Sequence, residues 1–261
     1  MKLLVKLGGT LLDSESSRSR LAAEIHEISR AGHQVVVVHG GGKQMTRFLT
    51  ERGIESHFVN GLRVTTPDVL DAVLKVFAGT VNQELVAAFI AAGAAAVGLT
   101  GIDAMLAEAE QMSPELGSVG RTVRSDARLL EVLTANGYLP VVACVAGDRA
   151  GRIYNVNADQ MAVTCAASFG AETLLFLTDV DGVRDGTGRV VPELTPEDCD
   201  RLIAEGTAHG GMQAKLNAAT DALRRGVPEV VIAPGAHQEI IQQVLAGAAQ
   251  GTRIGVCTNA N

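Results

Sequence analysis

The stretch VVVVHGGGKQM, residues 35–45, runs from four valines through three glycines into an amphipathic segment. An apolar run, a glycine turn and a helical pattern in this order predict a buried strand that leads into a helix. Such a junction presents free backbone N–H groups to an anion, above all to a phosphate. The glycines at 40–42 therefore favour an anion site. A flexible turn is the alternative, although three consecutive glycines cost backbone entropy.

This loop differs from two well-known phosphate-binding motifs. No Gly-Lys-Ser/Thr follows it at the spacing of a Walker A loop, and Met45 stands where the dinucleotide fingerprint has its last glycine. His39 is interpreted as a residue that orients the loop rather than as a base.

The rest of the chain repeats the alternation of apolar runs and helical patterns. Strands are expected at residues 3–5, 35–38, 95–99, 139–144, 173–177 and 229–232. Helices are expected at residues 17–30, 43–51, 67–90 with a break near Gly79, 127–136, 158–169, 196–205, 212–225 and 237–245. Nearly continuous Val/Leu strands between helices predict an α/β fold with a mainly parallel sheet that is covered on both faces.

Three segments interrupt this rhythm and are expected to form hairpins or short antiparallel strands: residues 57–65, 106–121 and 181–191. No Pro/Ser-rich linker or internal repeat is visible. We place a boundary near residues 145–155, which gives an N-terminal lobe of residues 1–150 and a C-terminal lobe of residues 151–261.

Composition narrows the function classes. The 261 residues are 47% hydrophobic with a net charge of −7 and no run of Lys or Arg, so a nucleic-acid partner is not expected. If the ligands are anions, their attraction must be local. The four cysteines are far apart, which argues against a zinc site and a dense disulfide framework. We find no signal peptide and no apolar run of membrane-spanning length, and expect a cytoplasmic protein.

Two lysines stand next to glycines where phosphates could bind. Lys6 precedes Gly8 and Gly9 at the end of the first expected strand, the edge at which open α/β sheets bind ligands. Lys215 lies one turn into a helix that opens with two glycines. For each lysine, a solvated surface position is the alternative.

Three further residues could contact a small acidic ligand. Arg63 lies in an expected hairpin and could grip a carboxylate, although a surface arginine is equally compatible with that segment. In the segment NVNAD, Asn157 is a plausible N-cap and Asp159 suits the first turn of the helix. Capping leaves Asn155 unexplained, so amides and a carboxylate that converge on a site remain possible.

With these segments in this order, the sequence closely resembles the amino acid kinase family. The similar segments are KLGG at 6–9, HGGG at 39–42, NGLRVT at 60–65, NVNAD at 155–159, LTDVDGV at 177–183, GGMQAKLNAA at 210–219 and GTRI at 251–254. They span almost the whole chain. NGLRVT together with NVNAD and the GM-x-x-K-x-x-A pattern is specific for the members that phosphorylate N-acetyl-L-glutamate.

The resemblance implies a three-layer αβα sandwich with about eight strands. It also implies ATP and Mg²⁺ as cofactors, and a reaction that converts N-acetyl-L-glutamate to N-acetyl-L-glutamyl 5-phosphate in arginine synthesis. The N-terminal lobe would bind this substrate and the C-terminal lobe MgATP.

Residue roles carry over from the same resemblance. Catalysis is implied for Lys6, Asp159, Lys215, Gly9 and Gly42. Substrate binding is implied for Gly41, Gly42, Arg63 and Asn155. Nucleotide binding is implied for Lys6, Thr178, Asp179, Gly211, Met212 and Lys215, and no protein-bound metal is expected.

The implied chemistry needs no general base, because a side-chain carboxylate with a pKa of about 4.3 is already ionised at neutral pH. Two anions must approach each other instead, and at about 4 Å they repel by roughly 4 kcal/mol at an effective dielectric constant near 20. Lysines, backbone N–H groups and Mg²⁺ would offset that repulsion. The glycines would then leave room for the phosphoryl group during transfer.

Some features depart from the family pattern. Ile102, Asp103 and Ala104 stand where many relatives carry Lys-Asp-Gly, and residues 256–261 run past the usual end. The first strand begins at residue 2, without the helix that links arginine-inhibited relatives into hexamers, so we expect a homodimer without strong arginine inhibition. Two alternatives stay open: a sister kinase for a carrier-protein-bound aminoadipate or glutamate, and a non-catalytic sensor of an amino acid derivative.

Overall fold

The chain is built around one eight-stranded sheet. A computed structural model describes residues 1–248 and 250–255, and of residue 9 the backbone alone. The strand order is β12-β14-β13-β11-β1-β2-β8-β5, and every neighbouring pair is parallel except β13 with β14. The strands are β1 (Lys2–Leu7), β2 (Gln34–His39), β5 (Ala95–Thr100), β8 (Tyr138–Ala143), β11 (Thr173–Thr178), β12 (Glu193–Leu194), β13 (Glu229–Pro234) and β14 (Thr252–Gly255). The predicted α/β class with a mainly parallel sheet is confirmed.

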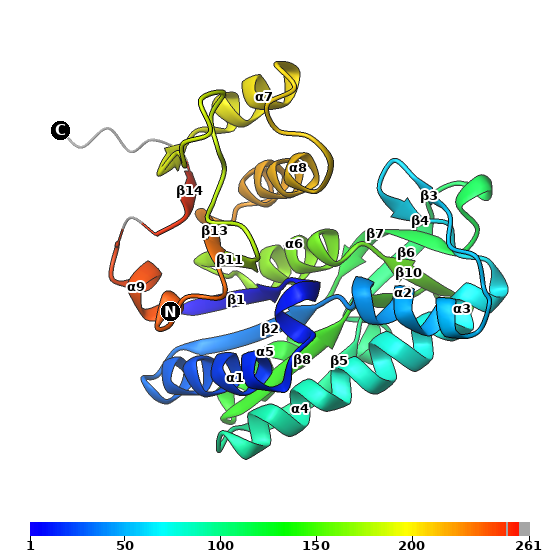
Figure 1. Cartoon of the computed structure of the whole chain (residues 1–261). Coiled ribbons are helices and arrows are strands. Elements are labelled where there is room, and N and C mark those ends of the chain that lie inside the picture. The colour runs from blue at the N-terminus through cyan, green and yellow to red at the C-terminus, as the bar shows by residue number, and fades with distance from the viewer. Residues whose placement is uncertain (249, 256–261) are drawn as a thin grey trace.

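Helices cover both faces of this sheet, as Figure 1 shows, which completes the three layers. The helices are α1 (Glu15–Arg30), α2 (Gly42–Glu51), α3 (Pro67–Val73), α4 (Asn82–Ala91), α5 (Arg128–Ala135), α6 (Ala158–Phe169), α7 (Pro196–Ala204), α8 (Gly210–Arg224) and α9 (Ile240–Leu245). Helices α1 and α4 lie against one face, and α6 and α8 lie against the other. Short 3-10 turns are η1 (Gly9–Leu12), η3 (Asp103–Met105) and η4 (Pro114–Leu116).

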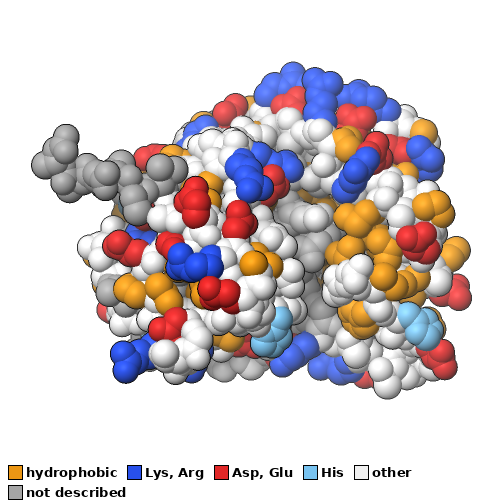
Figure 2. Space-filling view, turned by 90° about the horizontal axis from the view of Figure 1, so that it is seen from above, with side chains coloured by type: hydrophobic (Ala, Val, Ile, Leu, Met, Phe, Trp, Pro, Cys, Tyr) orange, Lys and Arg blue, Asp and Glu red, His pale blue; other side chains and the backbone are white. Residues whose placement is uncertain are grey.

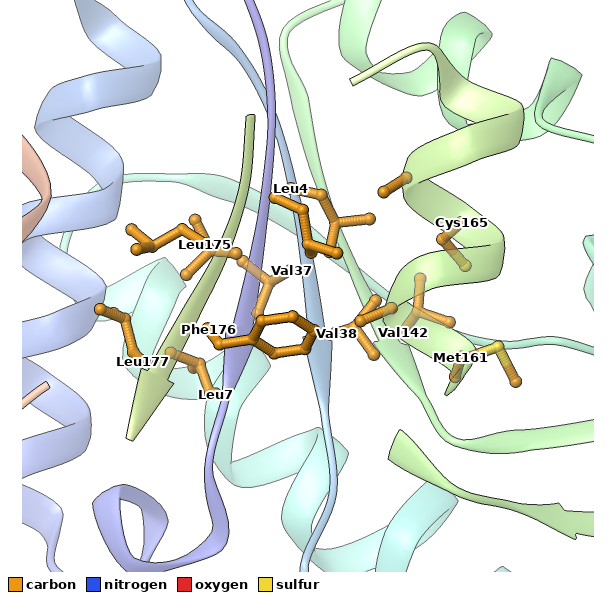
Figure 3. Packing of buried hydrophobic residues seen from close by; sticks show 14 of the residues in the cluster. Leu4, Leu7, Val37, Val38, Val142, Met161, Cys165, Leu175, Phe176 and Leu177 are labelled. Atoms are coloured by element: carbon orange, nitrogen blue, oxygen red, sulfur yellow. The ribbon is translucent and has the colours of Figure 1, made fainter. Parts of the chain in front are cut away.

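The core lies between the central strands and their helices. Leu4, Val38 and Phe176 from three adjacent strands are completely buried, and Figure 3 shows them on the face of the sheet that meets Met161 and Cys165 of α6. Burial of each such side chain contributes about 1.5–3 kcal/mol. Strands buried on both faces need continuous apolar runs, which is why the valines of residues 35–38 predict β2 correctly.

Smaller elements stand beside the sheet. A closed four-stranded barrel contains β6 (Ala107–Gln111), β7 (Val119–Ser125), β9 (Val145–Gly147) and β10 (Ile153–Val156). A two-stranded hairpin contains β3 (Phe58–Val59) and β4 (Leu62–Arg63). An antiparallel bridge joins Arg184 to Val190. All three predicted interruptions of the α/β rhythm therefore form antiparallel pairs.

One helical run differs from its prediction. Helices α3 and α4 are joined without a break by the π-helix η2 (Leu74–Val81), so the break predicted near Gly79 is wrong. The 25-residue run Pro67–Ala91 contains an 18-residue window with a mean hydropathy of 1.4, and by length and composition alone it could cross a membrane. The run also contains Asp68, Asp71, Lys75 and Glu84, so it is not an uninterrupted apolar run. A core helix passes the same test, and here 39% of the apolar window is buried.

Two other predictions concern segments outside the centre. Helix α9 begins at Ile240 rather than at residue 237, because Glu239 takes a left-handed backbone conformation with φ 56°. Cys144, Cys165 and Cys199 are buried free thiols, and burial raises the pKa of the first two to about 12. Cys257 and residues 256–261 lie outside the described residues.

Candidate active site

The adjacent parallel strands β11, β1, β2 and β8 end at the same edge of the sheet, where their last residues lie close together. Two joined cavities open at this edge. Figure 2, seen from above, shows a hollow near the middle of the surface. The first, of about 170 Å³, we call the glycine-loop cavity. It is lined by Gly40, Gly41, Gly42, Phe58, Gly61, Leu62, Arg63, Phe77, Val119, Cys144, Asn155, Val156, Asn157 and Ala158.

The second cavity, of about 410 Å³, we call the lysine cavity. It is lined by Lys6, Gly8, Thr10, Gly42, Lys43, Thr46, Phe58, Arg63, Thr178, Asp179 and Lys215. Four of these side chains are cations and one is a carboxylate, in a chain whose net charge is −7. The attraction for anions is therefore local, as the sequence required. The two cavities share Gly42, Phe58 and Arg63.

Lys6, Asp159 and Lys215 form one ion-pair triad although they lie far apart in the sequence. The Nζ atom of Lys6 lies 2.6 Å from Oδ1 of Asp159, and Nζ of Lys215 lies 3.7 Å from Oδ2. Lys6 projects from the end of β1, and Lys215 from the second turn of α8. The side chain of Asn157 accepts hydrogen bonds from the backbone N–H groups of Asp159 and Gln160, which fixes the first turn of α6.

The charge state of the triad follows from its surroundings. Burial would raise the pKa of Asp159, but the charges and hydrogen bonds of Lys6 and Lys215 outweigh burial and hold that pKa below its usual value. The carboxylate is therefore ionised at neutral pH. Two ammonium groups and one carboxylate leave a net charge of about +1 at the mouth of the lysine cavity, which favours an incoming anion.

The three loop glycines have different surroundings. A Cβ atom at Gly40 would lie 3.3 Å from Cβ of Ala158, and one at Gly41 would lie 2.9 Å from the Phe77 ring. A side chain at Gly41 would therefore force the Phe77 ring to move, whereas one at Gly40 would only press against Ala158. A Cβ atom at Gly42 would meet nothing within 4 Å. Only Gly42 faces open space, at the junction of the two cavities.

A buried polar network holds this loop from below. The Nδ1 atom of His39 lies 2.7 Å from the carbonyl oxygen of Gly40, and its Nε2 lies 3.0 Å from Nδ2 of Asn82. Asn82 also donates to the carbonyl oxygen of Val141. Burial lowers the pKa of His39 to about 4, so the ring is neutral, donates from Nδ1 and accepts at Nε2. This geometry supports the interpretation that His39 orients the loop.

Arg63 is a buried cation without an acidic partner. It is 8% exposed, and its Nη2 donates to Oγ1 of Thr46 at 2.9 Å, while Nη1 contacts Ser56. The guanidinium lies 4.6 Å from the Phe58 ring centroid, within cation–π distance. Burial lowers the pKa of Arg63, but a guanidinium stays charged. Among the described residues no carboxylate lies within ion-pair distance, so its charge is available to a ligand.

The remaining sequence predictions divide into residues that reach the cavities and residues that do not. Asn155 lines the glycine-loop cavity and donates to Oγ1 of Thr65 at 3.0 Å. Thr178 and Asp179 line the lysine cavity. Gly211 and Met212 open α8 one turn before Lys215 and line neither cavity. Gly9 opens η1, and its surroundings lie outside the described residues.

The departures at residues 102–104 lie away from both cavities. None of the three residues lines either one. Ala104 takes a φ of 51°, a conformation that costs glycine less than alanine. This departure therefore affects a turn rather than the candidate site.

Sequence reasoning missed several residues of the site. Phe58 lines both cavities, Lys43 and Thr46 line the lysine cavity, and Asn82 supports the loop. Only Lys43 carried a signal, because it directly follows the three glycines. In the described part of the chain, no group of three or more His, Cys, Asp or Glu side chains could hold a metal ion.

Comparison with known proteins identifies the relatives of this site. Residues 1–234 match the model of the amino acid kinase family. An acetylglutamate kinase from Solibacter usitatus is 66% identical over 254 residues, which cover 97% of this chain and 99% of that one. The chain belongs to the amino acid kinase family.

Solved structures of similar shape include a protein with a different reaction. The protein smu.665 from Streptococcus mutans UA159 has a TM-score of 0.84 and 25% identity, with 97% of this chain and 98% of that one covered. An N-acetylglutamate synthase from Neisseria gonorrhoeae, solved with coenzyme A and N-acetyl-glutamate, has a TM-score of 0.87 and 26% identity, with 98% and 59% covered. Because a synthase shares it, the fold alone does not decide the reaction.

Proposed function

We propose that this chain is an ATP-dependent kinase that phosphorylates the side-chain carboxylate of N-acetyl-L-glutamate. The product is N-acetyl-L-glutamyl 5-phosphate, and the reaction is the second step of arginine biosynthesis. The observation that carries the proposal is the triad of Lys6, Asp159 and Lys215 beside two joined cavities. The 66% identical acetylglutamate kinase supports the choice of substrate.

The glycine-loop cavity suits the acceptor. At about 170 Å³ it is smaller than the roughly 300–1,000 Å³ of drug-sized ligand pockets, so it fits an amino-acid-sized molecule. Arg63 and Asn155 supply a cation and an amide, and the other walls are glycine or apolar. Among the described residues that line it, none is acidic. An acetylated nitrogen is neutral and tolerated there, whereas a free ammonium group would be buried without a counter-charge.

The lysine cavity suits the phosphates of ATP, and we propose that Mg²⁺ enters with the nucleotide as MgATP. Phosphate oxygens and water supply most ligands of Mg²⁺ in such sites. Thr178 and Asp179 at the end of β11 would contact the nucleotide. We propose that the N-terminal lobe, residues 1–150, binds the acceptor and the C-terminal lobe, residues 151–261, binds the nucleotide.

The chain's residues act by position and charge. The acceptor carboxylate is ionised at neutral pH, and His39 is buried, neutral and bonded on both nitrogens, so no side chain removes a proton. Lys6 and Lys215 lower the repulsion between the carboxylate and the terminal phosphate, and Asp159 holds both ammonium groups in place. Gly42 leaves the space that the phosphoryl group crosses.

A substrate comparison tests this proposal. N-acetyl-L-glutamate, L-glutamate and L-aspartate are each incubated with MgATP, and the acyl phosphate is trapped with hydroxylamine while ADP is measured. We expect turnover with N-acetyl-L-glutamate. The kcat/KM for L-glutamate should be at least about 100-fold lower, because burial of its unpaired ammonium group costs about 3 kcal/mol or more of binding free energy. Equal kcat/KM for the acetylated and free amino acids would refute the proposal.

The two alternatives have less support. A non-catalytic sensor does not need the triad, and the 66% identical relative is a kinase. A carrier-bound substrate needs a basic docking surface, whereas the exposed arginines of β7 and the following helix are accompanied by Glu110 and Asp126. Free N-acetyl-L-glutamate is therefore the favoured acceptor.

We also propose a cytoplasmic homodimer. Ile90 on α4 is 59% exposed and β5 at the edge of the sheet is only half-buried, so the described residues leave part of an apolar face uncovered. Light scattering after size exclusion tests the dimer, and Ile90→Glu should shift it to monomer.

Cell fractionation tests the location. Activity titrated with arginine tests the predicted lack of strong inhibition.

A further inference from the structure

Lys43 is a cation of the lysine cavity that the mechanism above does not use. It occupies the second position of α2, directly after Gly42, and lines the cavity with Lys6 and Lys215. Its Nζ atom lies 3.5 Å from Oδ2 of Asp13, which follows η1. Asp13 does not line the cavity. Lys43 therefore stands between a carboxylate outside the cavity and the space inside it.

Lys6 and Lys215 alone do not balance the negative charge of a triphosphate in the lysine cavity. Asp159 neutralises half of the charge of Lys6 and Lys215, and Arg63 is buried on the wall shared with the glycine-loop cavity. A triphosphate carries more negative charge than one Mg²⁺ neutralises. At about 4 Å a further ammonium group attracts a unit negative charge by roughly 4 kcal/mol at an effective dielectric constant near 20. A third lysine at the rim would therefore strengthen nucleotide binding.

The bond that Lys43 makes to Asp13 is weak. The two side chains are 63% and 38% exposed, and an exposed ion pair contributes about 0.2–1 kcal/mol. The lysine stem has four rotatable carbons, so the ammonium group can move without the helix. The free energy lost when this ion pair breaks is therefore smaller than the free energy gained when the ammonium group contacts a phosphate.

We propose that Lys43 is a phosphate-binding residue that exchanges Asp13 for the terminal phosphate of MgATP. The proposal rests on the assignment of the lysine cavity to the nucleotide. Asp13 then acts as a competitor that holds the lysine near the cavity while no nucleotide is bound. In this arrangement the two residues set nucleotide affinity together, and Asp13 acts only through Lys43.

The test compares four proteins: wild type, Lys43→Met, Asp13→Asn and the double variant. Binding of the non-hydrolysable analogue Mg·AMP-PNP is measured by isothermal titration calorimetry, and kinetics by the hydroxamate assay. We expect Lys43→Met to raise the Kd of the analogue and the KM of MgATP about tenfold, the equivalent of about 1.4 kcal/mol. The KM of N-acetyl-L-glutamate should change less than about twofold, because Lys43 does not line the glycine-loop cavity.

The dependence of one substitution on the other decides the mechanism. Asp13→Asn alone should tighten analogue binding about two- to fivefold, which corresponds to the energy of an exposed ion pair. In the Lys43→Met background the same change should have no effect. Lys75→Met is the matched control, because Lys75 on η2 makes a similar exposed pair with Asp71 on α3, and neither residue lines a cavity. The control should keep wild-type Kd.

Two results would overturn the proposal: an unchanged Kd in Lys43→Met, or an equal effect of Asp13→Asn with and without the lysine. Calorimetry reports nucleotide binding without phosphoryl transfer, so its outcome is separate from that of the substrate assay. If wild type binds the analogue but does not phosphorylate N-acetyl-L-glutamate, the proposed acceptor is wrong. The role of Lys43 is then still decided by the four binding constants.

Discussion

The glycine-loop cavity and the lysine cavity share Gly42, Phe58 and Arg63, but the rest of their walls differ in kind. The first is small, largely glycine and apolar, and contains one buried cation. The second is more than twice as large and carries four cations and one carboxylate. Shape and the cost of burying a wrong charge should therefore select the acceptor. Charge neutralisation should bind the nucleotide and lower the barrier. Substitutions in the two cavities should then change different kinetic constants.

The largest effect is expected at the triad. Lys6→Met and Lys215→Met should each lower kcat by about 10²–10³-fold, because each removes a charge placed where negative charge builds up during transfer. The hydroxamate assay measures this loss, and circular dichroism checks the fold. The control is Lys2→Met, which removes a lysine from the other end of the same strand, where it pairs with Glu131. Normal turnover in either triad variant would exclude its role.

A smaller effect is expected at Arg63, on the KM of the acceptor rather than on kcat. Arg63→Leu should raise the KM of N-acetyl-L-glutamate about 100-fold, roughly 3 kcal/mol, because a buried charged contact is lost. The KM of MgATP should change less than threefold if the guanidinium serves the acceptor. Arg52→Leu is the matched control, since Arg52 stacks on Phe48 as Arg63 stacks on Phe58 but lines neither cavity. Equal increases in both KM values would mean that the two cavities are not independent.

The glycine loop allows activity and stability to be separated within two adjacent positions. Gly42→Ala should lower kcat about tenfold and leave the melting temperature unchanged, because the new methyl group enters open space at the junction. Gly41→Ala should instead lower the free energy of unfolding by about 1–3 kcal/mol, because its Cβ meets the Phe77 ring. Thermal melting and the hydroxamate assay on both variants check this contrast. A reversed pattern would place the transfer path elsewhere.

Local signals explain how much of this molecule could be predicted from its sequence. Helix α6 was predicted with both ends correct, because Asn157 caps its start and Gly170, with φ 68°, ends it. The valines of β2 and the glycines after it predicted the position of the loop. The family resemblance implied the residues of the triad, whereas local sequence alone left each lysine compatible with a solvated surface position, and the fold brings Lys6 and Lys215 to one carboxylate.

The features that could not be predicted from the sequence depend on contacts between residues that are distant in the chain. The amide of Asn82 meets His39 across 43 positions, and no local pattern marks it. Phe58 belongs to both cavities because the hairpin folds over Gly42, which its neighbours in sequence do not reveal. The helix passes Gly79 because η2 widens to a π-helix, whereas propensity alone predicted a break. The contact of Gly41 with the Phe77 ring also has no local signal in the sequence, although Gly41 lines the glycine-loop cavity as well.

The smallest effect near neutral pH is expected at His39, beneath the glycine-loop cavity. Its ring is neutral there in both the folded and most of the unfolded protein, so stability near neutrality depends little on its proton. In the folded state burial lowers the pKa of His39 to about 4, whereas an unfolded histidine has a pKa of about 6.5. The unfolded state therefore binds a proton first as pH falls.

The sign of the effect follows from that order. The contribution of neutral His39 is fully present above pH 6.5 and is lost progressively as pH falls towards 4, by about 3 kcal/mol for the 2.5-unit difference. Urea unfolding between pH 7.5 and 4.5 should show a shallower loss of stability in His39→Gln than in wild type. His57→Gln should follow wild type, because that side chain is 72% exposed. Parallel curves for wild type and His39→Gln would mean that the ring takes up a proton inside the folded protein, and a charged ring beneath Gly40 would then add to the attraction that the lysines and Arg63 exert on anions.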